Sequence, residues 1–110
     1  MAKLVRDKIP IPEGVRPAKD DREFAHFVLK KIVEEAKEVQ AAGSRVLQGR
    51  CVDPEAEHAQ LVAELADVQD LIALVCDTFN LRMTDVLAAS FEKARVKGGF
   101  DKRLIWWEEP

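Results

Sequence analysis

Apolar positions recur with the period of an α-helix over most of the chain. Between residues 20 and 42, apolar side chains return every three or four residues and so share one helical face. The positions on this face are Phe24, Phe27, Val28, Ile32, Ala36 and Val39. We predict a helix that begins at a cap formed by Asp20 or Asp21 and ends near Ala42-Gly43, because glycine readily takes the left-handed conformation of a helix end. Residues 44–52 are then a connection.

A second apolar stripe follows the dipeptide Asp53-Pro54. Aspartate caps helices well and proline fits the first helical position, so this pair predicts a helix start. The residues that form the stripe are Leu61, Leu65, Val68, Ile72, Val75 and Phe79. Asn80 is the predicted end of this helix.

A shorter third helix is predicted from Thr84, which can cap it, to Gly98-Gly99, which stops it. Asp85 falls in the first turn, where a negative charge is favourable. The apolar side of this helix contains Val86, Leu87, Phe91 and Ala94. The aromatic and aliphatic residues of the tail, 100–110, predict a short strand or a strap over the bundle.

The first nineteen residues show no helical period. Pro10, Pro12 and Pro17 prevent a continuous helix there, so residues 1–19 are predicted to form an extended arm. Strand signals are weak, and the whole chain, 1–110, is predicted to be one all-α domain with two long antiparallel helices at its centre. Apolar residues make up 47% of the sequence, which is generous for a small helical chain. We therefore expect a homodimer or a higher homo-oligomer.

Composition and charge narrow the class of protein. No stretch of 18 apolar residues exists and the N-terminus lacks the apolar segment of a signal peptide, which predicts a cytoplasmic protein without a membrane partner. The net charge of -3 argues against a general nucleic-acid binder. Residues 33–70 carry nine acids and three bases, whereas residues 93–103 carry five bases and one acid. This asymmetry suits a metal ion with a phosphate ligand, but two solvated surfaces would look the same.

Four acids fall on the apolar faces of the two long helices. At about 100° per residue, Glu35 and Glu38 lie among the apolar positions of the first helix, and Glu64 and Asp67 among those of the second. Each pair is spaced i, i+3, so its members project together. Buried carboxylates need nearby cations. Either salt bridges to lysines and arginines or a hard divalent cation between the helices satisfies this need.

The order of these acids resembles that of a known family. Residues 34–38, with the sequence EEAKE, and residues 64–67, with the sequence ELAD, fit the pattern EExxE…ExxD. This pattern is typical of the MazG-like, all-α nucleoside triphosphate pyrophosphatase superfamily. The opening KLVRDKIP and the closing KGGFDKRL are similar to a short, phosphoribosyl-ATP pyrophosphohydrolase-like branch of that superfamily. The resemblance spans nearly the whole chain.

The resemblance implies roles for particular residues. Its magnesium ligands, for which Mn²⁺ is a substitute, would be Glu35, Glu38, Glu64 and Asp67. Glu34 would orient a ligand or position the attacking water, so the catalytic carboxylates would be Glu34, Glu35 and Glu38. Phosphates also need fixed positive charge. The candidates are the bases of the third helix and tail, together with two arm residues that match the family motif: Lys93, Arg95, Lys97, Lys102, Arg103, Arg6 and Lys8.

The expected function is magnesium-dependent hydrolysis of a nucleoside triphosphate to the monophosphate and pyrophosphate, as house-cleaning of non-standard nucleotides. A phosphoribosyl-ATP pyrophosphohydrolase is the alternative within this class. A non-catalytic helical interaction module, whose acids make only salt bridges, is an alternative of a different kind. Phe100, Trp106 or Trp107 could stack on a base, although core packing is the commoner role of such residues.

Overall fold

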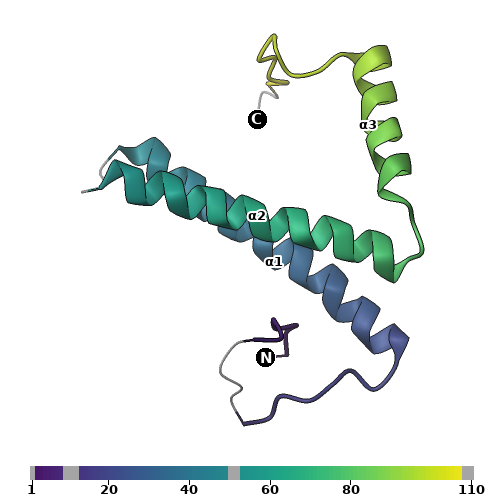
Figure 1. The fold of residues 1–110 in the computed structure, drawn as a ribbon. Helices are drawn as coiled ribbons and strands as arrows, with labels where there is room; N and C mark the ends of the chain where they lie inside the picture. The colour runs from purple at the N-terminus through teal and green to yellow at the C-terminus, as the bar shows by residue number, and fades with distance from the viewer. Residues whose placement is uncertain (1, 9–12, 50–52, 108–110) are drawn as a thin grey trace.

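The described part of the chain folds into three helices. The computed structural model describes residues 2–8, 13–49 and 53–107, and within them it contains α1 (Asp21–Gln48), α2 (Pro54–Thr78), α3 (Met83–Lys97) and no strand. α1 and α2 lie side by side, whereas α3 leads away from the pair (Figure 1). The all-α prediction is confirmed, and the strand considered for the tail is absent from residues 100–107.

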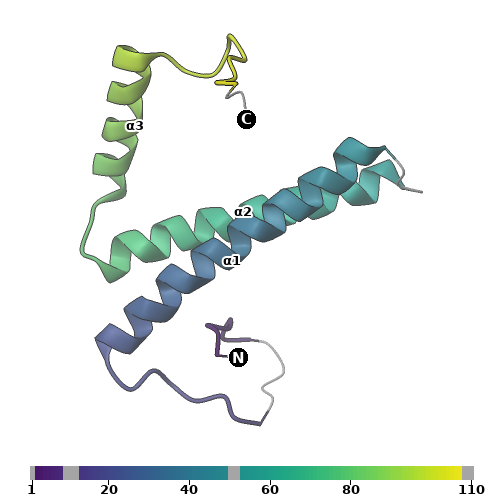
Figure 2. The same ribbon diagram turned by 180° about the vertical axis from the view of Figure 1, so that it is seen from behind.

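The start of α1 agrees with the prediction. The Asp20 carboxylate accepts a hydrogen bond of 2.8 Å from the backbone N–H of Glu23, so it caps the helix. Asp21 and Glu23 place negative charge in the first turn, where the helix dipole favours it. Residues 13–20 lead into this end of the helix, and residues 2–8 lie beside α1 and α2 (Figure 2).

The end of α1 differs from the prediction. The helix does not stop at Gly43 but continues to Gln48, and Gly49 takes the left-handed conformation with φ 63° and ψ 19°. The predicted connection is therefore wrong for residues 44–48, and its residues 50–52 lie outside the described chain. A glycine inside a helix costs only about 1 kcal/mol relative to alanine. Burial of the neighbouring Ala42 and the helix-forming residues that follow outweigh this cost.

Both ends of α2 follow the sequence signals. Asp53 accepts a hydrogen bond of 3.2 Å from the backbone N–H of Ala56. After Thr78, Asn80 adopts a left-handed conformation with φ 58°. The backbone N–H of Leu81 then donates to the Cys76 carbonyl at 2.7 Å, as in a Schellman motif. Asn80 thus ends the helix as predicted, two residues beyond its last helical residue.

α3 begins at Met83, two residues earlier than a cap at Thr84 predicts. Arg82 is the N-cap residue and Thr84 lies inside the first turn, so the prediction that Thr84 caps this helix is wrong. Asp85 does lie in the first turn, and the Arg82 guanidinium pairs with it at 3.3 Å. No side chain caps the start of this helix with a hydrogen bond. Gly98 ends the helix, as predicted.

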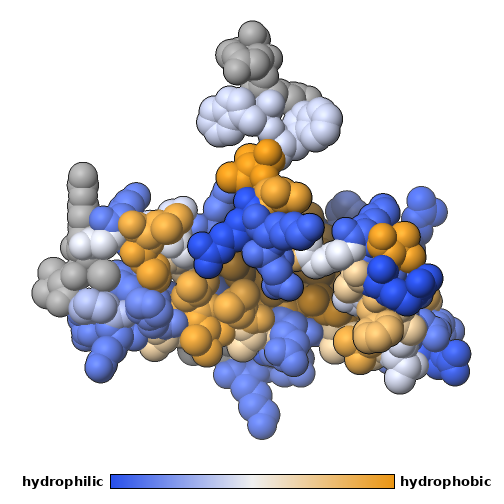
Figure 3. All heavy atoms as spheres, turned by 90° about the horizontal axis from the view of Figure 1, so that it is seen from above, coloured by the Kyte–Doolittle hydropathy of each residue, from blue (hydrophilic) through white to orange (hydrophobic). Residues whose placement is uncertain are grey.

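The hydrophobic core is thin. Among the described residues, the buried apolar side chains are Val28, Ala42, Leu71 and Cys76, and they belong to α1 and α2. The accessible surface is 10002 Å², whereas a compact monomer of this mass exposes about 6,100 Å². The radius of gyration is 17.7 Å, against about 13 Å for a compact domain of this length. Apolar side chains lie open to solvent on the face seen in Figure 3.

The tail and α3 account for much of this exposed surface. Phe91 on α3 is 75% exposed, and in the tail Phe100 is 96% and Trp106 88% exposed. Within one chain, core packing is therefore the wrong role for Phe100, Trp106 and Trp107. None of the helices in the described residues combines the length and the apolar character needed to cross a membrane.

Candidate functional site

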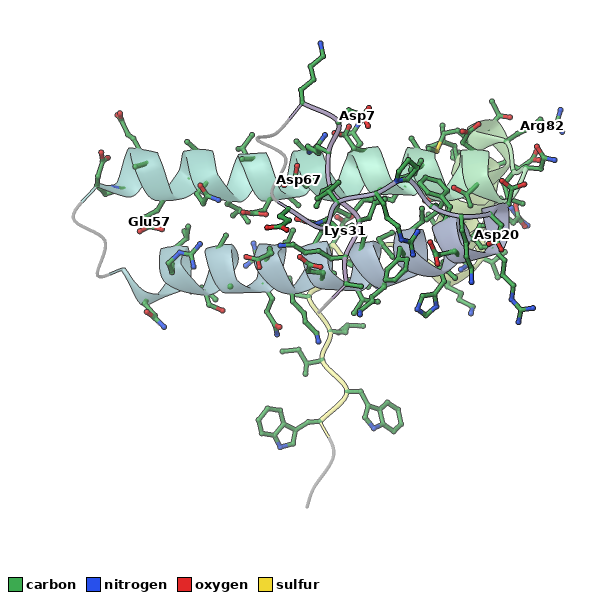
Figure 4. All side chains as sticks on the ribbon, turned by 90° about the horizontal axis from the view of Figure 1, so that it is seen from below. Asp7, Asp20, Lys31, Glu57, Asp67 and Arg82 are labelled. Carbon is green, nitrogen blue, oxygen red and sulfur yellow. The ribbon has the colours of Figure 1, made fainter. Side chains whose placement is uncertain are left out.

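Three of the four predicted metal ligands meet between α1 and α2. Glu35 is buried on α1, and Glu64 and Asp67 are half-buried on α2. One carboxylate oxygen from each lies within 4.8 Å of the other two. Asp67 points into the space between the helices, next to Lys31 of α1 (Figure 4). We call Glu35, Glu64 and Asp67 the acid cluster.

The other two predicted carboxylates of α1 lie outside the acid cluster. Glu38 is exposed to solvent. Three residues at about 100° each turn its side chain by about 60° from Glu35, enough to move it off the face that meets α2. Glu34 is half-buried and lies 3.4 Å from the Lys31 ammonium group. It flanks the acid cluster without joining it.

Lys31 is a further member of the site and is not among the residues predicted from the sequence. Its Nζ lies 3.2 Å from Glu35 Oε1 and 3.4 Å from Glu34 Oε1, and its side chain is largely buried. The i, i+3 and i, i+4 spacings were visible in the sequence and could have revealed these contacts. On α2, the Gln60 amide donates a 2.6 Å hydrogen bond to Glu64 in the same way.

The N-terminal arm supplies the second cation. Arg6 Nη2 lies 2.6 Å from Asp67 Oδ1 and 3.1 Å from Asp70 Oδ2. The hydrogen bonds that Arg6 donates to Asp67 and Asp70 raise the pKa of Arg6 above its ordinary value. Of the predicted phosphate-binding residues, Arg6 is the one that the structure brings to the acid cluster. Lys8 is exposed on the arm.

Salt bridges therefore explain part of this arrangement of acids, but they do not neutralise all of its negative charge. Five carboxylates, including those of Glu34 and Asp70, face the two cations Arg6 and Lys31. Oxygen ligands at about 2.1 Å from Mg²⁺ lie about 3 to 4.2 Å from one another. The oxygens of the acid cluster are close to this spacing, so small side-chain rotations would let Glu35, Glu64 and Asp67 hold one divalent ion.

An open groove of about 660 Å³ adjoins the acid cluster. Residues 3–7 of the arm form one side, and its floor includes Lys31, Glu35, Asp67 and Asp70. Small-molecule sites usually have volumes of about 300 to 1,000 Å³. A hollow of about 790 Å³ lies between the two parts of the arm, but no acid of the cluster lines it. The smaller groove is the one that adjoins the acid cluster.

The basic residues of α3 and the tail do not line this groove. Lys93, Arg95, Lys97 and Lys102 are exposed, as is Arg103 in the tail. Arg95 pairs with Glu92 of the same helix at 2.6 Å. Because α3 leads away from α1 and α2 (Figure 1), these residues are remote from the acid cluster of their own chain.

Comparisons of the chain with family models, curated proteins and solved structures gave no match.

Proposed function

We propose that this protein is a magnesium-dependent nucleoside triphosphate pyrophosphohydrolase that resembles the MazG-like superfamily. The observation that carries the proposal is the acid cluster: three carboxylate oxygens from two helices lie within 4.8 Å of one another. Two neighbouring cations leave an excess of negative charge there, and hard divalent ions prefer oxygen ligands of this kind. The groove beside the cluster has room for a nucleotide's phosphates.

In this proposal Glu35, Glu64 and Asp67 hold the ion. Glu38 is one turn further along α1 and would join them only by turning in from solvent, so we assign it a weaker, outer role. The chemistry that Mg²⁺ supplies in such sites is charge neutralisation on phosphate oxygens and acidification of water. Mn²⁺ is the expected substitute.

The reaction would begin with a water molecule placed beside the α-phosphate. The water oxygen bonds to the α-phosphorus while the bond to the α,β-bridging oxygen breaks, and pyrophosphate leaves. Glu34 can take the water's proton, because its carboxylate flanks the acid cluster without belonging to it. Lys31, 3.4 Å from Glu34, holds that carboxylate in place.

The proposed active form is a homo-oligomer with antiparallel α1 and α2 at its centre. The excess accessible surface of nearly 4,000 Å² per chain is ample for a stable interface, which needs about 800 Å² per partner. An α3 that is remote from its own acid cluster would reach the cluster of a second copy. Lys93, Arg95, Lys97, Lys102 and Arg103 would then bind the departing β- and γ-phosphates in that copy.

Hydrolysis in oxygen-18 water tests the reaction directly. A panel of standard and non-standard nucleoside triphosphates, with phosphoribosyl-ATP as a separate member, would be scored for pyrophosphate release. We expect label in the monophosphate. Label in orthophosphate or pyrophosphate, or no hydrolysis of any member, would refute the proposed reaction.

A non-catalytic helical interaction module is the second candidate. The observations that favour it are the ion pairs of Arg6 and Lys31, which already meet part of the negative charge, and the exposed apolar side chains. Thermal unfolding separates the two functions, because a ligand that binds only the folded state raises the melting temperature. A melting temperature unmoved by millimolar Mg²⁺ and Mn²⁺ would favour the interaction module.

A further inference from the structure

Arg6 connects the N-terminal arm to the acid cluster. Its Nη2 lies 2.6 Å from Asp67, which belongs to the cluster, and 3.1 Å from Asp70, which does not. Asp67 and Asp70 lie one turn apart on α2, so a single guanidinium spans both. The contact joins residues that are 61 positions apart in the chain. Asp67 is therefore shared between the arm and the proposed metal site.

We propose that Arg6 and the divalent ion compete for Asp67, so that metal entry releases Arg6 to bind a substrate phosphate. This inference rests on the proposed function. Asp67 cannot fully satisfy both cations, since the guanidinium and the ion repel each other at such short range. When Asp67 turns to the metal, Asp70 keeps Arg6 beside the groove. Arg6 lines the groove, and a guanidinium binds phosphate oxygens well.

Lys31, the other cation of the site, is less able to exchange its partners in this way. Lys31 contacts Glu34 and Glu35 on its own helix, and its side chain is largely buried. The Arg6 side chain is 63% exposed and projects from an arm whose backbone is tied elsewhere. Lys30 donates a 3.2 Å hydrogen bond to the Ala2 carbonyl. A side-chain rotation therefore frees Arg6 while the arm stays in place.

The competition gives Arg6→Ala two effects of opposite sign. Removing the guanidinium should tighten Mn²⁺ binding about two- to fivefold, which is the size of an exposed ion pair. The same change should weaken binding of inorganic pyrophosphate in saturating Mg²⁺ about tenfold, because a charged hydrogen-bond donor is lost. A residue that only supported the fold would weaken both.

Arg16→Ala is the matched control. Arg16 belongs to the same arm and carries the same charge, but it pairs with Glu23 at 2.7 Å, outside the acid cluster. Titration calorimetry of both variants and the wild type, with Mn²⁺ and with pyrophosphate, measures the two affinities without turnover. We expect Arg16→Ala to match the wild type in both. Circular dichroism checks that each variant is folded.

The outcomes separate this inference from the proposed function. If the wild type binds Mn²⁺ and Arg6→Ala binds it no more tightly, the competition is wrong while the metal site stands. If Arg6→Ala loses no pyrophosphate affinity, the release of Arg6 to phosphate is wrong. If neither protein binds Mn²⁺, the proposed metal site and this inference fall together. Binding by Arg6→Ala alone would support the competition in its strongest form.

Discussion

The burial of each carboxylate distinguishes the members of the acid cluster from the other acids more clearly than their spacing in the sequence does. Glu35 is buried and Glu64 half-buried, whereas Glu38, which belongs to the same sequence pattern, is exposed. The i, i+3 rule predicts that neighbours project together, but it does not say which of them faces the second helix. The Arg6–Asp67 contact was beyond sequence analysis for another reason: it spans 61 residues and depends on the path of the arm.

Substitution of these carboxylates tests the assignment of ligands. Glu64→Gln keeps the size of the side chain and removes one charged ligand, so we expect about 10- to 100-fold weaker Mn²⁺ binding and a large loss of turnover. Glu38→Gln changes the same chemical group in an exposed position and should weaken binding less. Calorimetry with Mn²⁺ measures both variants. Equal losses would show that Glu38 is a full ligand and contradict the three-acid arrangement.

The arm also contains an ion pair that responds to pH. A hydrogen bond from Arg16, supported by the backbone N–H of Lys19, lowers the pKa of Glu23 from 4.5 to about 2. A carboxylate with a lowered folded-state pKa stabilises the fold above its unfolded pKa, and this contribution disappears as the pH falls through the folded value. The window of loss therefore runs from about pH 4.5 down to about pH 2.

Arg16→Ala should reveal that window. The difference in melting temperature between the wild type and Arg16→Ala should be constant above pH 5 and shrink as the pH is lowered toward 2, because Glu23 then becomes protonated in both proteins. Thermal unfolding followed by circular dichroism between pH 7 and pH 2 measures this difference. A gap that stays the same over the whole range would show that the Arg16–Glu23 pair does not stabilise the fold.

At the scale of helices, local signals predict the N-terminal caps of α1 and α2 but miss the start of α3 and the end of α1. Asp20 and Asp53 cap their helices with hydrogen bonds to backbone groups three residues away, an interaction that is complete within one turn. The end of α1 depends on whether helix formation beyond Gly43 is favourable enough to carry a glycine. The helix continues to Gln48, and in this last stretch Arg45 pairs with Glu57 of α2 at 3.4 Å, a partner that the local sequence does not reveal.

Two glycine substitutions test where α1 ends. Gly43 lies within the helix and an added Cβ meets no atom within 4 Å, so Gly43→Ala should stabilise the fold by about 0.5 to 1 kcal/mol. Gly49 has φ 63°, where an L side chain is strained, so Gly49→Ala should destabilise it by about 1 kcal/mol. Urea unfolding measures both free energies. The reverse order would place the end of the helix at Gly43.

At the scale of the whole molecule, the chain has too few internal contacts for its apolar content. α1 and α2 pack together, but α3 contributes little to this packing, and the tail is exposed. The apolar share of 47% predicts surplus apolar surface from composition alone. Composition could not reveal that α3 would stand apart, because that depends on the turn after Asn80, where the left-handed residue sets the direction of the chain.

A charge placed in the proposed subunit interface should dissociate the oligomer, whereas the same charge elsewhere on α2 should not. Leu65 is 50% exposed on α2, and Ala63 lies on nearly the opposite side of that helix. Both flank Glu64, so Leu65→Glu and Ala63→Glu place the same charge at the same sequence distance from the acid cluster. We expect Leu65→Glu to dissociate the oligomer and Ala63→Glu to leave it intact. Light scattering after size-exclusion chromatography decides between them.

Tryptophan fluorescence from the tail can show whether the chains associate. Trp106 and Trp107 are the two tryptophans of the chain, and both are more than three-quarters exposed in a single chain. If a second copy covers the tail, the indole rings leave water and their emission shifts to shorter wavelength. We expect blue-shifted emission from a species of at least twice 12.4 kDa, and a red shift upon dilution or in Leu65→Glu. The Ala63→Glu protein should keep the wild-type spectrum.

Solvent-exposed emission from a 12.4 kDa species at every concentration would contradict the homo-oligomer. It would also remove the means by which α3 could bring its lysines and arginines to an acid cluster.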